Sequence, residues 1–267
     1  MNQKSGNPVY RFLRQRGLSV CQAEPFEKTI HNHIKKSLQR EEFNRHFASY
    51  SYRIFIRDLL AIRHHISPDS FGLFIERDRA ENYLELSEKL SLLEKDSDGQ
   101  YTFALKDVTD IGDTFEYFVA QILRNMDFDA VWGVKFEGIS SGGDFDVIGL
   151  AAGKLFYIEA KTSPPKHVEA GEISNFFERF ISLRPDLGIL LNDTHLRMKD
   201  KLVPLIEEEV EKRRGIGARM ERLEREIFSL NGRIFVANTK RDIGVNLKIC
   251  FDHFFYQDWK GTVPFPP

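Results

Sequence analysis

Two stretches of the chain decide its fold: Gly142-Gly143-Asp144-Phe145-Asp146-Val147-Ile148 and Phe156-Tyr157-Ile158-Glu159-Ala160-Lys161. Each is a mainly apolar run that carries charged residues. Because only a few residues separate the two runs, they predict two neighbouring strands joined by a turn. The first strand brings aspartates, and the second brings Glu-x-Lys.

Side chains alternate across a strand, so residues two positions apart share a face. The second stretch has an apolar face of Phe156, Ile158 and Ala160, and an opposite face of Leu155, Tyr157, Glu159 and Lys161. In the first stretch, Phe145 and Val147 share one face, and Asp144, Asp146 and Ile148 share the other. Charges at the tip of an apolar strand are costly unless they are paired or hold a metal ion.

Hard divalent cations such as Mg²⁺ prefer carboxylate oxygens and keep several of their waters. Two carboxylates from the adjacent strands, together with a nucleic-acid phosphate, would complete such a shell. A metal ion there acts as a Lewis acid on the phosphate and lowers the pKa of a bound water. Lys161 can orient or deprotonate that water, or stabilise the charge that grows on the phosphate. These residues therefore suffice for phosphodiester hydrolysis that depends on Mg²⁺, with Mn²⁺ as a substitute.

The order Gly-x-Asp-Phe-Asp146-Val-Ile, with Ile-Glu159-Ala-Lys161 following so that Glu159 comes thirteen residues after Asp146, resembles the PD-(D/E)XK nuclease superfamily. The chain is most similar in this to archaeal-type Holliday-junction resolvases and Mrr-like restriction enzymes. The resemblance covers about residues 110–192. It implies a restriction-endonuclease-like fold, and it points to Asp146 rather than Asp144 as the metal ligand. Phe145 stands where the family usually has proline.

The same resemblance assigns a role to Glu116. The first core helix of the family often carries a glutamate that joins the metal shell, and Glu116 fits that position. The stretch Asp113-Thr114-Phe115-Glu116 is equally typical of a capping box, with Asp113 as the N-cap and Glu116 reaching back. Both interpretations stay open at the level of sequence.

Simpler interpretations exist for the central residues as well. Glu159 and Lys161 could form a weak ion pair at a solvated strand end, and the Gly-Gly-Asp sequence could be an ordinary turn. These alternatives have to account together for two apolar strands, a glycine-rich turn and charges on matching faces. We therefore favour the nuclease interpretation.

Composition places the chain among ordinary globular proteins. It has 267 residues, of which 42% are hydrophobic, and a formal net charge of −2. No apolar run is long enough to cross a membrane, and residues 1–20 lack the apolar core of a secretory signal. Cys21 and Cys250 are the only cysteines and are expected to be buried, small apolar residues. A reducing compartment, the cytoplasm, is the expected location.

Charge is unevenly distributed along the chain. Residues 1–63 contain twelve Lys or Arg and five acids, which leaves the remainder at −9. A basic N-terminal module could contact phosphates. Amphipathic helices with solvated basic faces explain the same excess equally well.

The pattern of the chain predicts two domains, residues 1–109 and 110–267. The first is mainly helical, with helices within residues 24–66 and 79–95, a turn at 96–100 and a strand at 101–105. This order resembles the end of a winged-helix domain. The helix that would then enter DNA carries Glu81, Glu85 and Glu88, and this acidity disfavours insertion into a groove.

The second domain is predicted to be α/β, with a restriction-endonuclease-like mixed sheet flanked by helices. Helices are expected at 114–125, 170–183, 199–214, 218–230 and 245–255, the last capped by Asp242. Strands are expected at 130–136, 144–151, 154–161, 187–191 and 234–237.

The expected function is that of a Mg²⁺-dependent endonuclease acting on DNA in restriction, repair or junction processing. Asp146, Glu159 and Glu116 would bind the metal ion, and Lys161 would activate water. Lys166 and His167 are candidates for lining the DNA path. A homodimer is expected because twofold symmetry matches a duplex. The alternative is a catalytically silent protein of the same fold that binds nucleic acid or acts as a scaffold.

Overall fold

The computed structural model describes residues 6–71, 75–139, 143–163, 167–215 and 217–262. The chain forms two compact units. The helical unit is Pro25–Phe118, and the sheet unit combines Met1–Glu24 with Val119–Pro267.

This grouping differs from the expected boundary at residue 109. The N-terminal segment belongs with the sheet because strand β1 (Val20–Gln22) pairs antiparallel with strand β4 (Asp129–Phe136). The other boundary falls within helix α6 (Gly112–Asn125). The basic segment of residues 1–63 is therefore divided between both units and is not one module.

The sheet unit is built on one eight-stranded sheet with the order β1-β4-β5-β6-β7-β10-β9-β8. Its remaining strands are β5 (Phe145–Ala151), β6 (Lys154–Lys161), β7 (Leu187–Asn192), β8 (Glu221–Glu224), β9 (Ile227–Leu230) and β10 (Ile234–Asn238). Its helices besides part of α6 are α1 (Pro8–Gln15), α7 (Ala170–Leu183), α8 (Leu202–Arg214) and α9 (Ile243–Thr262). The expected α/β class with a mixed sheet flanked by helices is confirmed.

The sheet combines antiparallel and parallel pairs. Strands β4, β5 and β6 form an antiparallel meander. Strand β7 runs parallel to both β6 and β10, because helix α7 and helix α8 lie in the two crossovers. The start of β5 therefore lies at the same edge as the ends of β6, β7 and β10.

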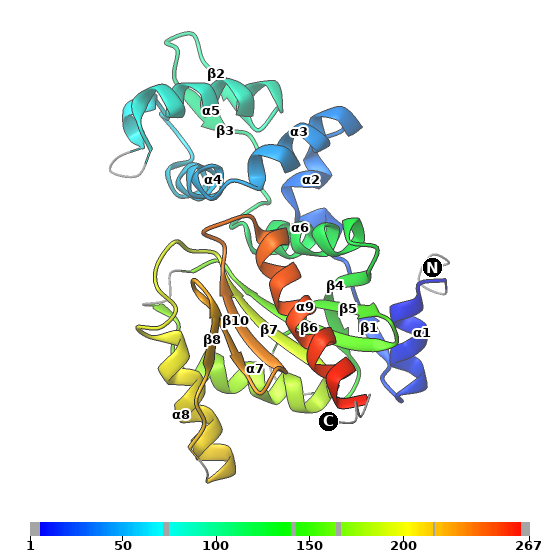
Figure 1. Cartoon of the computed structure of the whole chain (residues 1–267). Coiled ribbons are helices and arrows are strands. Elements are labelled where there is room, and N and C mark those ends of the chain that lie inside the picture. Colours follow the sequence, from blue (N-terminus) through cyan, green and yellow to red (C-terminus); the bar gives the residue numbers. More distant parts are fainter. Residues whose placement is uncertain (1–5, 72–74, 140–142, 164–166, 216, 263–267) are drawn as a thin grey trace. The chain divides into compact units, whose positions relative to one another are not determined.

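Helices cover both faces of the sheet (Figure 1). The ring of Tyr157 stacks on Phe176 of α7 at 5.7 Å, and the ring of Phe156 meets Phe251 of α9 at 4.8 Å. The predicted alternation along β6 is therefore confirmed. It is interrupted in β5, where Phe145 contacts Tyr157 at 5.3 Å and so does not follow the face of Val147.

Helix α7 lies close to the sheet because a glycine makes room for it. A Cβ atom on Gly188 of β7 would come within 2.6 Å of the ring of Phe180 in α7. This close approach matters for the site because α7 also carries two charged residues that reach the end of β6.

The helical unit packs around aromatic rings. Its elements are two 3₁₀ turns, Phe26–Lys28 and Pro68–Ser70, helices α2 (Ile30–His33), α3 (Ser37–Phe47), α4 (Tyr50–Ile62) and α5 (Arg77–Lys89), strands β2 (Leu93–Lys95) and β3 (Tyr101–Phe103), and the start of α6. Phe43 stacks on Phe47 at 5.1 Å, and Tyr52 stacks on Phe55 at 5.7 Å. Buried rings hold the short helices together.

The expected order of a helix followed by a hairpin is present. Strands β2 and β3 pair antiparallel, and Ile66 bridges to Tyr101 beside them. Helix α5 ends at Lys89, earlier than expected, because Leu93–Lys95 is a strand. Its three glutamates are exposed. The winged-helix assignment itself stays a prediction.

One helix prediction was wrong. Residues 218–230 form the hairpin of β8 and β9 instead of a charged helix. Their alternating charges were interpreted as a solvated helix, but Ile227, Phe228 and Leu230 are buried where β9 pairs with β10. Pairing within the sheet outweighs the local helix propensity of this segment.

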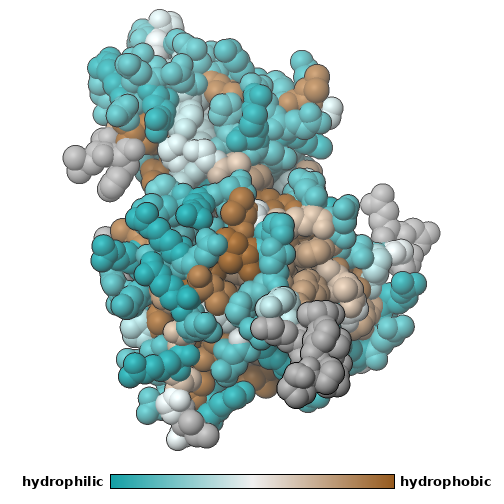
Figure 2. All heavy atoms as spheres, viewed as in Figure 1, coloured by the Kyte–Doolittle hydropathy of each residue, from teal (hydrophilic) through white to brown (hydrophobic). Residues whose placement is uncertain are grey.

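Several smaller expectations were tested by the structure. Asp242 does cap α9, since its side chain accepts from the backbone N–H of Val245 at 3.0 Å. Both cysteines are free; Cys250 is buried as expected, whereas Cys21 is exposed. Hydrophobic residues interrupt the mostly hydrophilic surface near α9 (Figure 2). Among the described residues, no helix is long and apolar enough to cross a membrane.

Candidate active site

Three of the residues that the sequence predicts to act together are brought together. Asp146 lies at the start of β5, and Glu159 and Lys161 lie at the end of β6. The pairing of Val147 with Ile158 continues toward Asp146 opposite Glu159. The backbone N–H of Ala160, the residue between Glu159 and Lys161, donates to Asp146 Oδ2 at 2.7 Å. This bond holds the carboxylate of Asp146 beside the end of β6.

Glu159 is the centre of the cluster and is fully buried. Both of its oxygens accept from Arg179 of α7, at 2.8 and 2.7 Å, and Lys161 Nζ lies 2.8 Å from Oε1. The hydroxyl of the buried Tyr157 donates to Oε2. Burial alone would raise the pKa of Glu159, but Lys161 and Arg179 hold that pKa below its usual value. Glu159 is therefore ionised and forms ion pairs with two cations, Lys161 and Arg179.

Lys161 lies between two carboxylates. Its Nζ atom is 3.3 Å from Oε1 of Glu172 in α7, in addition to its contact with Glu159. Burial opposes its charged form, but Glu159, Asp146 and Glu172 outweigh that effect and raise the pKa of Lys161. The amine is therefore a cation at neutral pH.

Asp146 is electrostatically different from Glu159. In the described part of the chain, no lysine or arginine forms an ion pair with it. Burial raises the pKa of Asp146 well above its usual range, and the neighbouring Glu159 raises it further. Lys161, the N–H of Ala160 and Arg179 only partly oppose this. The site is thus short of positive charge on the side of Asp146.

Gly143 has a role beyond that of a turn residue. Its φ angle is +102°, a region that favours glycine. A Cβ atom there would lie 2.7 Å from an Nη atom of Arg179. The glycine before the first aspartates therefore leaves the space through which the guanidinium reaches Glu159. Gly142 lies outside the described residues.

The neighbouring strand fixes the backbone of Lys161. Asn192 of β7 is its Cα partner, and the amide of Asn192 donates to the carbonyl of Ser163 at 2.8 Å. The N–H of Asp193 donates to the carbonyl of Lys161 at 2.7 Å. These bonds tie the end of β6, which carries Lys161, to β7 and the residue that follows it.

Glu116, Lys166 and His167 are the other predicted site residues. Glu116 belongs to the helical unit, so its role as a third metal ligand stays a prediction. Its alternative role in a capping box is wrong, because α6 begins at Gly112 and already contains Asp113. His167 is exposed, and Lys166 lies outside the described residues.

The residues present fit one hard divalent cation. Two carboxylates converge, and no lysine or arginine of the described residues forms an ion pair with Asp146. Within the described residues there is no group of three or more His, Cys, Asp or Glu side chains that could hold a metal ion. Such a cation would therefore complete its shell with water or phosphate oxygens, as Mg²⁺ commonly does, and would share Glu159 with Arg179 and Lys161.

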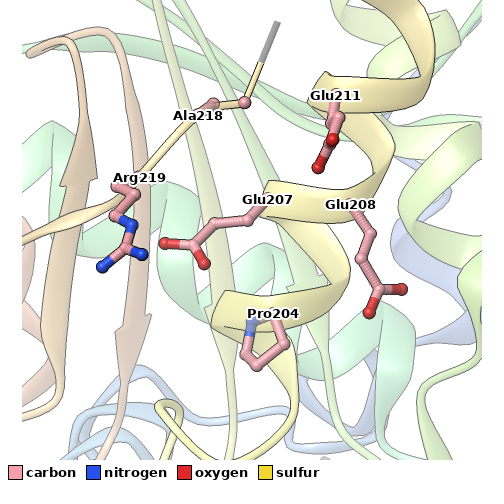
Figure 3. A pocket seen from close by; sticks show the side chains of 7 residues that line it. Pro204, Glu207, Glu208, Glu211, Ala218 and Arg219 are labelled. Carbon is pink, nitrogen blue, oxygen red and sulfur yellow. The ribbon is translucent and has the colours of Figure 1, made fainter. Parts of the chain in front are cut away.

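A pocket of about 420 Å³ lies elsewhere in the sheet unit, between α8 and the segment before β8 (Figure 3). Glu207 points toward Arg219 across it, and Oε1 of Glu207 accepts from the N–H of Met220 at 2.8 Å. Its lining residues are Pro204, Glu207, Glu208, Glu211, Gly217, Ala218 and Arg219. None of them belongs to the cluster around Glu159.

Sequence reasoning missed Arg179, Glu172 and Tyr157. A signal was available for the first two, because Glu172, Phe176 and Arg179 recur at helical spacing on one face. Phe176 was expected in the core, so the charged residues one turn before and one turn after it were candidates for facing the sheet. Tyr157 shares a strand face with Glu159, but its hydroxyl contact could not be read from spacing alone.

No protein-family model matches the chain, and no curated protein matches it. Among solved structures, Can2 from Sulfobacillus thermosulfidooxidans, solved in complex with cyclic tetra-adenylate, is 15% identical over 91% of this chain and 61% of its own, with a TM-score of 0.49. Protein VC1899 from Vibrio cholerae is 14% identical over 85% of this chain and 57% of its own, with a TM-score of 0.45. The chain thus spans about three fifths of the length of each.

Proposed function

We propose that this protein is a metal-dependent endonuclease of the PD-(D/E)XK type that hydrolyses DNA phosphodiester bonds. The observation that carries the proposal is the meeting of Asp146, Glu159 and Lys161 at one edge of the sheet. The residues come from two adjacent strands in the order that the superfamily resemblance implies. No lysine or arginine of the described residues forms an ion pair with Asp146, and a divalent metal ion would supply that charge.

Asp146 and Glu159 would hold the metal ion. Mg²⁺ bound there supplies a Lewis acid for a phosphate oxygen and a more acidic water. Burial of both carboxylates strengthens their attraction for a cation, because the local dielectric is low. The surrounding bonds from Ala160 and Tyr157 keep the two carboxylates oriented.

Lys161 acts through its positive charge. Since Glu159 and Glu172 keep the amine protonated, it orients the attacking water or stabilises charge that develops on the phosphate. Acting as a base would first require the loss of its proton to solvent, which these contacts oppose. Of the roles open at the sequence level, the contacts of Lys161 favour charge stabilisation.

The proposal is tested by cleavage of DNA in the presence of Mg²⁺ or Mn²⁺ and of EDTA. A panel of a four-way junction, a flap, a single strand, and plain and methylated duplex covers the open substrates. Lys161→Met should lower the cleavage rate by roughly 10²–10⁴-fold, the usual contribution of one positioned catalytic group. The matched control is Lys248→Met, which removes an exposed Lys–Asp pair of α9. If Lys161→Met and the control cut DNA equally fast, Lys161 has no part in catalysis.

A catalytically silent binding protein is the second candidate, and one observation favours it. Glu159 is already paired with Arg179 and Lys161, so the cluster could serve as a buried ion-pair network. In that case Mn²⁺ would not raise the melting temperature, and salt-sensitive binding of DNA would persist without cutting.

A further inference from the structure

We propose that Arg179 is a positioning residue that stands in for the metal ion in the metal-free protein and competes with that ion for Glu159. This inference rests on the proposed function. It gives α7 a part in controlling when a cation binds between Asp146 of β5 and Glu159 of β6.

The contacts of the guanidinium carry the inference. One nitrogen of Arg179, Nη1, donates to both oxygens of Glu159, at 2.8 and 2.7 Å. Hydrogen bonds between a guanidinium and a carboxylate are charge-assisted and roughly twice as strong as those between neutral groups. Together with Lys161 and Tyr157, they use the acceptor positions of Glu159 that a metal ion would need.

The approach of Arg179 is built into the backbone. Gly143 leaves room for the guanidinium at a position where any other side chain would collide with it. Arg179 also lies on the α7 face that packs on the sheet, and it is almost completely buried. Removing such an arginine from Glu159 therefore requires another cation to take its place.

The charge balance of the cluster supports the exchange. Asp146, Glu159 and Glu172 supply three carboxylates, and Lys161 and Arg179 supply two cations. With all groups ionised, the cluster has one negative charge in excess. A divalent cation would change this to one positive charge, which the single negative charge of a phosphodiester would then neutralise.

The affinity of the site for a metal ion should therefore depend on the strength of the contact between Arg179 and Glu159. A cation that binds between Asp146 and Glu159 has to take at least one oxygen from the guanidinium, and the two positive charges repel each other. If Arg179 is replaced by a neutral residue, both obstacles disappear and the affinity for the metal ion rises.

The experiment measures binding of Mn²⁺ to the full-length, metal-free protein by calorimetric titration. Arg179→Met should lower the Kd for Mn²⁺ by at least about tenfold, which corresponds to about 1.4 kcal/mol. The matched control is Arg213→Met. Arg213 of α8 also pairs with carboxylates, Glu209 and Glu178, at 2.6 and 2.8 Å. The Kd of the Arg213→Met variant for Mn²⁺ should stay within about twofold of the wild-type value, since a charge outside the cluster contributes little.

Arg179→Gln serves where Arg179→Met does not fold, because glutamine is neutral and still donates to Glu159. It too should bind Mn²⁺ more tightly than the wild type. An unchanged or weaker affinity in the folded Arg179 variant overturns the inference while leaving the proposed function in place. Wild-type protein that binds no Mn²⁺ overturns both.

Discussion

Helix α7 contributes residues to two arginine–carboxylate clusters that differ in their surroundings. Arg179 holds Glu159 at 2.7 Å, and Arg213 of α8 reaches Glu209 at 2.6 Å and Glu178 of α7 at 2.8 Å. The side chain of Glu159 is 1% exposed, whereas that of Glu178 is 52% exposed. Only the first cluster contains an additional carboxylate, Asp146, that has no cation of its own.

The comparison shows that an ion pair alone does not define a site. In the Arg213 cluster both carboxylates contact the same arginine, and Glu178 stays in contact with solvent, so the cluster connects α7 and α8. The Arg179 cluster lies at the edge of the sheet, and its central carboxylate, Glu159, is fully buried. A buried carboxylate that forms no ion pair with a lysine or arginine of the described residues, as Asp146 is, distinguishes a candidate metal site from a structural ion pair.

The largest expected difference between the two clusters is in stability. Glu159→Leu leaves Arg179 buried without its carboxylate and should destabilise the metal-free protein by about 3–5 kcal/mol. Glu178→Leu removes a carboxylate that is 52% exposed and leaves Arg213 paired with Glu209, so it should cost less than about 1 kcal/mol. Urea unfolding of both variants in EDTA measures the two values. Equal losses would show that burial does not separate the clusters.

A smaller effect is expected at the glycine that admits Arg179. Gly143→Ala combines a positive φ angle with a collision and should destabilise by about 1–3 kcal/mol. Gly215→Ala is the matched control, because Gly215 also has a positive φ angle, +67°, but nothing lies within 4 Å of its Cβ position. It should cost about 1 kcal/mol.

The collision itself can be isolated by a second substitution. In an Arg179→Met background, Gly143→Ala should cost no more than Gly215→Ala does. Additive losses in the double variant would mean that Gly143 and the guanidinium are not coupled.

The smallest effect is expected at the outer contact of Lys161. Glu172→Gln removes a charge 3.3 Å from Nζ that is partly exposed, so the cleavage rate should fall by less than about tenfold. Glutamine can still accept from the N–H of Glu169 and keep the start of α7 capped. A loss as large as that of Lys161→Met would place Glu172 at the centre of the site instead.

Much of the sheet and the inner part of the site could be predicted from sequence. The alternation along residues 154–161 located both the strand and the face that carries Glu159 and Lys161, because period-two patterns are local. The hairpin of β8 and β9 could not be predicted, since its pairing with β10 depends on contacts that local charge patterns do not show. The same is true of residues 6–24, whose place in the sheet unit depends on β4.

Arg179 shows the limit for the site itself. Its distance from Glu159 in sequence gives no indication of a contact, and only the crossover geometry of α7 brings the two together. The lack of an ion pair between Asp146 and a described lysine or arginine is also a property of the assembled cluster, because Lys161 and Arg179 pair with Glu159 instead.

The central claim is that Asp146 and Glu159 bind a divalent cation, and one titration tests it most directly. Mn²⁺ is added to metal-free wild-type protein and to Asp146→Asn, whose side chain can still accept from the N–H of Ala160. The wild type should bind Mn²⁺ and gain thermal stability, and Asp146→Asn should lose most of both responses. Identical binding curves for the two proteins would contradict the claim.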